Sequence, residues 1–184
     1  MVRILVGREP SHLVLDLEPV EVGLLASLAA QVADFVAPDA DVDPLVALVG
    51  LDPTAQTPVD PAMRRLFPDA YGDDPDASAR FRRFTERDLR ERKRAAALVV
   101  LDAVTQVDPD EGGSVAFDGE ALDSWLAFLT DARLTLGTRV GVSDDNHDEL
   151  TALPQEDPRS GMYAVYHWLT YLQDATVSGL LGDS

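Results

Sequence analysis

Two short runs of alternating apolar and polar residues lie at the start of the chain. Residues 2–6 are rich in β-prone side chains, and Leu13, Leu15 and Leu17 would share one side of an extended strand. Residues 7–11 between the runs contain glycine, proline and serine, which are typical of a turn. This pattern predicts a β-hairpin.

Longer segments then repeat apolar residues every three or four positions, which is typical of helices with one buried face. The pattern predicts helices over about 19–36, 76–107, 118–137 and 161–181. Either Asp76 or Ser78 is suited to cap the second of them. Shorter features are predicted between these helices: a third strand at 115–117, an acidic helix at 143–150, and helical turns at 45–49 and 62–67.

The predicted fold class is therefore α+β and mainly helical, with about four main helices and a small three-stranded antiparallel sheet that includes the N-terminal hairpin. A length of 184 residues favours one domain, which we predict over residues 1–184. Within it, residues 38–76 are predicted to be a long irregular connection rich in proline and aspartate. A connection of this length is usually functional or mobile, and its prolines could also stiffen it as it packs over the core.

Composition excludes several kinds of site. The chain has no cysteine, so it has no disulfide and no thiolate ligand or nucleophile. It has only three histidines, and we expect neither a metal site nor a cofactor. The longest apolar run, residues 95–101, is too short to span a membrane, and the N-terminus lacks the apolar segment of a signal peptide. We therefore expect a cytoplasmic protein without a membrane partner.

Charge is distributed unevenly along the chain. The formal net charge is −18, yet eight of the 15 basic residues lie in residues 80–94, where only three residues are acidic. The remainder of the chain is strongly acidic. Such a field repels nucleic acid, so DNA is a less favoured partner than protein.

Five arginines recur at spacings of three and four residues in the predicted helix 76–107. At about 100° per residue they fall within an arc of about 80°, so they share one helix face. We call this set the arginine stripe; it comprises Arg80, Arg83, Arg87, Arg90 and Arg94. Like charges four residues apart repel. Part of this repulsion is offset by predicted pairs along the helix: Glu86–Arg90, Asp88–Arg92 and Arg87–Glu91.

Two interpretations of the arginine stripe remain open at this stage. Acidic loops of the same chain, such as residues 73–76 or 144–145, could neutralise it. Alternatively, the stripe binds an acidic protein partner, which need present only one complementary patch.

A second cluster lies in the predicted helix 161–181. If the aliphatic residues of this helix face inward, its aromatic residues gather on the other side; they are Tyr163, Tyr166, His167 and Tyr171. Tyrosine and histidine suit an interface, because each has an apolar body and a polar tip. The cluster is either buried inside the fold or forms a second contact surface, including a homodimer surface.

The sequence gives little support for catalysis. Residues 143–149 include serine, histidine and carboxylates, but an N-capped surface helix uses the same residue types. Gly112 and Gly113 lack the spacing of a phosphate-binding loop. We assign no catalytic residue and predict a protein that is not an enzyme. The alternative is an enzyme that uses surface carboxylates.

Several motifs together resemble an actinobacterial family of unknown function that includes the AosR-type oxidative-stress regulators. They are Leu66-Phe-Pro-Asp-Ala-Tyr71, Phe81-Arg-Arg-Phe-Thr-Glu-Arg-Asp-Leu89, Asp131-Ala-Arg-Leu134, Leu136-Gly-Thr-Arg-Val-Gly141 and Tyr166-His-Trp-Leu169. The resemblance implies a cytoplasmic regulator that acts through a sigma factor or another transcription component. The redox switch of AosR-type members is an intramolecular disulfide, which a chain without cysteine cannot form.

These observations predict a cytoplasmic regulatory or adaptor protein associated with transcription or stress response. We expect it to bind an acidic protein through the arginine stripe. The alternative within regulation is a transcriptional regulator that binds DNA directly.

Overall fold

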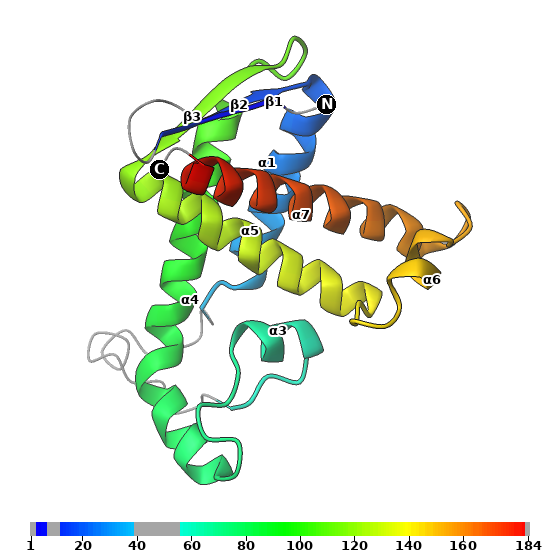
Figure 1. Cartoon of the computed structure of the whole chain (residues 1–184). Helices are drawn as coiled ribbons and strands as arrows, with labels where there is room; N and C mark the ends of the chain where they lie inside the picture. The colour runs from blue at the N-terminus through cyan, green and yellow to red at the C-terminus, as the bar shows by residue number, and fades with distance from the viewer. Residues whose placement is uncertain (1–2, 7–11, 39–55, 183–184) are drawn as a thin grey trace.

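The computed structural model describes residues 3–6, 12–38 and 56–182. The small sheet consists of β1 (Arg3–Val6), β2 (His12–Leu17) and β3 (Gly113–Asp118). The central strand β2 pairs antiparallel with β1 on one side and with β3 on the other (Figure 1). The pairing of β1 with β2 confirms the predicted hairpin, whose turn at residues 7–11 lies outside the described residues.

The described residues form six helices: α1 (Pro19–Phe35), α3 (Pro61–Leu66), α4 (Pro75–Thr105), α5 (Gly119–Val140), α6 (His147–Thr151) and α7 (Pro158–Gly182). A mainly helical fold with a small antiparallel sheet is thus confirmed. The four main helices of the prediction correspond to α1, α4, α5 and α7, and the short helices α3 and α6, of six and five residues, bring the number in the described residues to six. The predicted acidic helix at 143–150 is shorter than expected and begins at His147.

The core forms where α1, α4 and α5 pack together beneath the sheet and α7 packs along α5 (Figure 1). Its largest side chain is Trp125 of α5, which stacks on Phe117 of β3 with ring centroids 5.0 Å apart. The indole N–H of Trp125 donates a hydrogen bond to Thr176 Oγ1 of α7 at 3.2 Å. This bond satisfies the one polar atom of a fully buried ring.

Part of the predicted irregular connection over residues 38–76 can be described. Residues 39–55, which include the predicted helical turn at 45–49, lie outside the described residues. The helical turn expected at 62–67 corresponds to α3, which begins one residue earlier behind its N-cap Asp60. The Asp60 carboxylate accepts hydrogen bonds from the first free amides of α3.

The start of α4 differs from the prediction. Its N-cap is Asp74, whose side chain accepts a hydrogen bond from the Ala77 amide at 2.8 Å, and Pro75 occupies the first helical position. Ser78 does not cap the helix because its hydroxyl bonds both backbone groups of Tyr71, at 2.8 and 3.0 Å. Asp76 lies within the first turn.

Within the described ranges, no helix combines the length and the apolar character needed to cross a membrane.

Candidate functional site

The cationic part of the chain, residues 80–94, lies mainly in the N-terminal half of α4. Figure 1 shows that this half extends beyond α1, α5 and α7, at the end of the molecule opposite the sheet. The C-terminal half of α4 instead packs in the core, where Val100 and Val104 are fully buried. The exposed N-terminal half depends for its support on the segment 67–71, which lies against it.

Arg82 fastens the segment 67–71 to α4 from the inner face of the helix. Only 5% of its side chain is exposed. Its Nη2 atom lies 2.7 Å from Asp69 Oδ1 and donates to the Phe67 carbonyl oxygen at 3.1 Å. Its Nη1 atom pairs with Glu86, which is 7% exposed. Charge-assisted contacts of this kind make up for the cost of removing a guanidinium from water.

Glu86 lies between two arginines. Its Oε1 atom is 2.7 Å from Arg90 Nη2, while its Oε2 atom pairs with Arg82. The Arg90 guanidinium also lies over the Phe67 ring, 4.6 Å from the ring centroid. We call the four charged residues Asp69, Arg82, Glu86 and Arg90 the buried ion-pair network after its buried centre, Arg82 and Glu86; the Asp69 side chain at its edge is 40% exposed.

The ion pair between Arg82 and Asp69 shifts the pKa of both groups. The hydrogen bond from Arg82 is the main reason that the pKa of Asp69 lies below its ordinary value. Burial opposes ionisation of Arg82, but hydrogen bonds and charges from Glu86 and Asp69 outweigh burial and raise the pKa of Arg82. Both shifts favour the charged forms of Asp69 and Arg82.

A separate ion pair joins α4 to α5. Lys93 Nζ lies 2.6 Å from Oδ1 of Asp131, whose side chain is almost completely buried. Burial raises the pKa of Asp131, and the nearby Lys93 only partly offsets that effect. The pair lies in the contact between two helices, where it fixes their relative position rather than facing a substrate.

The structure divides the arginine stripe into two groups. Arg87 pairs with Glu91 at 3.1 Å and Arg90 with Glu86 at 2.7 Å, so two of the three predicted pairs along the helix are confirmed. The pair Asp88–Arg92 does not form between these described residues.

Three members of the stripe remain exposed to solvent. Arg80, Arg83 and Arg94 have no ion-pair partner among the residues that the structure describes. None of the acidic residues at 73–76 or 144–145 pairs with the stripe in this part of the chain. Over the described ranges, the acidic loops considered above therefore do not neutralise it.

An exposed aromatic side chain, Phe84, lies beside the stripe, and the sequence did not predict its exposure. Phe84 is 63% exposed and Phe81 is 47% exposed. The Tyr71 ring meets the Phe81 ring edge to face, with centroids 6.1 Å apart. Helical spacing contains the signal, since Phe84 lies four residues after Arg80 and three before Arg87.

The aromatic cluster of α7 is divided between the interior and the surface. Tyr163 is 4% exposed, and its hydroxyl lies between the rings of His147 and His167, 3.2 Å from His167 Nε2. Tyr166 is half-buried, whereas His167 and Tyr171 are exposed. Any second contact surface on α7 would therefore depend on His167 and Tyr171, with Tyr163 supporting them from inside.

The acidic segment 143–149 supplies no metal site that the structure can place. Among the described residues, no group of three histidine or carboxylate side chains is arranged to hold a metal ion. His147 of this segment instead bonds Tyr163.

Fold and site together define a mainly helical protein with one cationic helix face on an acidic body. The chain belongs to the family described as domain of unknown function DUF2017, whose model matches residues 3–180. This match confirms the resemblance inferred from the motifs.

Two curated relatives are named oxidative stress regulator AosR, one from Mycobacterium tuberculosis and one from Mycobacterium bovis. Each is 33% identical to this chain over 186 residues, a match that covers 91% of this chain and 82% of the relative. No solved structure matches the chain.

Proposed function

We propose that this protein is a non-enzymatic regulator that binds an acidic protein partner through the exposed side of α4. The names of its relatives support a role in regulation, and specifically in the response to oxidative stress. The sigma factors and other transcription components implied by the family resemblance are the partners to test first.

The observation that carries this proposal is the state of Arg80, Arg83 and Arg94. The chain has 33 acidic residues, yet these three guanidiniums are exposed and meet no carboxylate of the described ranges. Holding like charges on one helix face costs free energy. A carboxylate-bearing partner would relieve this repulsion and accept the paired N–H donors of each guanidinium.

The exposed aromatic residues favour a protein over other polyanions. Aromatic and arginine side chains together make up the strongest contacts of protein interfaces, because they bury large area while keeping polar bonds. Phe84, four residues after Arg80, lies beside the stripe, and Tyr71 and Phe81 add exposed aromatic surface near the start of α4. These rings would receive apolar side chains of the partner. We therefore expect the partner segment to carry both carboxylates and apolar residues.

The test uses two charge reversals on the same helix. Arg83→Glu changes the arginine stripe, whereas Arg92→Glu makes the same change at an exposed arginine on the other side of α4. Tagged full-length proteins would be used to capture partners from a lysate of the native organism, with identification by mass spectrometry. We expect Arg83→Glu to reduce capture of the principal protein by at least about tenfold, with Arg92→Glu close to wild type.

Three outcomes would contradict the proposal. If both variants reduce capture of the partner protein equally, capture depends on overall charge and not on the arginine stripe. If neither variant reduces capture, the arginine stripe does not take part in binding. Recovery of nucleic acid in place of protein, sensitive to Arg83→Glu, would favour the DNA-binding alternative. Matching circular dichroism spectra of the variants serve as the control for folding.

A further inference from the structure

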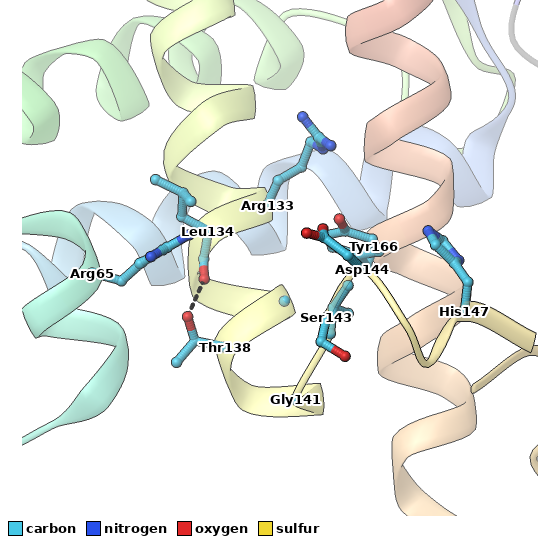
Figure 2. Close-up of a pocket in the computed structure, with 11 residues that line it drawn as sticks. Arg65, Arg133, Leu134, Thr138, Gly141, Ser143, Asp144, His147 and Tyr166 are labelled. Carbon is cyan, nitrogen blue, oxygen red and sulfur yellow. Dashed lines mark hydrogen bonds between the residues drawn. The ribbon is translucent and has the colours of Figure 1, made fainter. Parts of the chain in front are cut away.

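We propose that a hollow at the C-terminal end of α5 binds a small organic anion that carries a carboxylate or phosphate group. The hollow has a volume of about 700 Å³, which is within the range of small-molecule sites. Its walls come from α3, α5, the loop after α5, α6 and α7 (Figure 2). It shares no residue with the arginine stripe, so the two proposals are independent.

Arg133 of α5 is the main reason to expect an anion. Its Nε atom donates to Thr170 Oγ1 at 3.0 Å, and its Nη1 atom donates to the side-chain oxygen of Gln173. Its guanidinium also lies 5.6 Å from the centroid of the Tyr166 ring. All three neighbours are neutral. They fix the orientation of the guanidinium but leave its positive charge uncompensated, which is the arrangement of a preorganised anion site.

A second guanidinium lines the same hollow from another helix. Arg65 of α3 is exposed and forms no ion pair with any described residue (Figure 2). Two unpaired arginines at one hollow are unexpected in a chain of net charge −18, because carboxylates greatly outnumber basic groups. One carboxylate, Asp144, also lines the hollow, and it is exposed to solvent.

The rest of the wall favours an organic anion over a bare inorganic ion. The Tyr166 ring packs so closely on α5 that a Cβ added at Gly137 would lie 3.1 Å from its Cε2 atom. The ring is therefore held in place as a flat wall beside Arg133. Ser143 and His147 add side chains that can donate hydrogen bonds (Figure 2).

Three probes distinguish the possible sources of the anionic group. Inorganic phosphate, citrate and AMP would each be titrated into the full-length protein at about 150 mM NaCl, where loose surface attraction is screened. Calorimetry would measure the affinity, and amide chemical shifts in residues 133–143 would report the location. We expect saturable binding of citrate or AMP with a Kd on the order of 1 mM or below, tighter than for phosphate.

The variants test whether Arg133 is responsible. Arg133→Gln should raise the Kd at least about tenfold, since it removes a charged partner of the ligand. Arg65→Gln should raise the Kd by a smaller factor. If Arg133→Gln does not fold, the Arg65→Gln variant still tests the site. Arg92→Gln, at an exposed arginine of α4, should leave the Kd unchanged. Absence of saturable binding for all three probes, or equal weakening by Arg92→Gln, would overturn the proposal.

Discussion

Arg82 and Arg83 are adjacent in the sequence, yet their guanidiniums lie in opposite environments. Arg82 faces inward and bonds Asp69, Glu86 and the Phe67 carbonyl. Arg83 faces solvent and meets no carboxylate of the described residues. A helix turns by about 100° per residue, so one step along α4 separates a structural arginine from one available for binding. Substitution of Arg82 should therefore reduce stability, whereas substitution of Arg83 should reduce partner binding.

Removal of the Glu86 carboxylate tests the structural half of this pattern. Glu86→Ala leaves Arg82 buried with only Asp69 as a charged partner and deprives Arg90 of its ion pair. Breaking a buried pair in this way typically costs about 3–5 kcal/mol, and we expect a loss toward the lower end because Arg82 keeps Asp69. Urea unfolding followed by circular dichroism measures the change.

Glu91→Ala is the matched control for this prediction. Glu91 also pairs with an arginine four residues away on α4, but its side chain is 54% exposed. Exposed helix pairs contribute about 0.3–0.5 kcal/mol. If the two variants lose a similar amount of unfolding free energy, burial is not the reason that the Glu86 ion pairs stabilise the protein.

Asp69 gives the network a pH dependence of definite sign. The Arg82 hydrogen bond lowers the pKa of Asp69 in the folded protein below its ordinary 3.8. The unfolded chain therefore takes up this proton at higher pH than the folded chain. The resulting stabilisation is fully present above pH 3.8 and is lost as pH falls through the lowered pKa.

Asp69→Asn should therefore destabilise the protein at neutral pH, with a difference from wild type that shrinks below about pH 4. Urea unfolding at a series of pH values measures the difference in free energy. Asp88→Asn, at an exposed α4 carboxylate without an ion pair among the described residues, should show no such trend. A constant or growing difference for Asp69→Asn at low pH would exclude the ion pair as its cause.

At the scale of the element, the start of α4 is set by Asp74 and Pro75 together. Asp74→Ala removes the hydrogen bond to the Ala77 amide and should cost about 1 kcal/mol. The loss should be local, since the C-terminal half of α4 is packed in the core. Hydrogen exchange should thus increase mainly in the first turns of α4. Asp73→Ala, at the preceding exposed carboxylate, is the control, and equal effects would contradict Asp74 as the cap.

The helices could be predicted from sequence because burial of one face requires apolar residues at helical spacing. The prediction for 19–36 thus agrees closely with α1 at Pro19–Phe35. The start of α4 could not be predicted in the same way. Asp74, Asp76 and Ser78 are all suitable caps by residue type. Ser78 is excluded as the cap because its hydroxyl is hydrogen-bonded to the backbone N–H and carbonyl of Tyr71.

The candidate site was predictable to a similar degree. Spacing alone placed the five arginines of the stripe on one face, and it predicted the partners of Arg87 and Arg90. It did not reveal the buried ion-pair network. Arg82 and Glu86 are charged, and their burial depends on Phe67 and Asp69, which are 13 to 15 residues from Arg82 in sequence. A helical pattern contains no information about such a contact.

At the scale of the whole molecule, the charge of the acidic body limits which partners can reach α4. The net charge is −18, and the cationic stretch is confined to residues 80–94 of one helix. Any large polyanion that contacts the stripe also comes near acidic surface. A protein segment a few residues long can avoid this repulsion, because fields between exposed charges decay over a Debye length of about 8–10 Å.

Binding to duplex DNA distinguishes a regulator that contacts an acidic protein from one that contacts DNA directly. We expect no complex between the full-length protein and a random-sequence duplex at about 150 mM salt, because few phosphates can be neutralised while many face the acidic body. An electrophoretic shift assay, with fluorescence anisotropy as a second readout, measures this. Arg83→Glu is the control variant. If a complex forms at this salt and Arg83→Glu abolishes it, the arginine stripe binds DNA. A single substitution on α4 abolishes the complex only if α4 itself contacts the duplex.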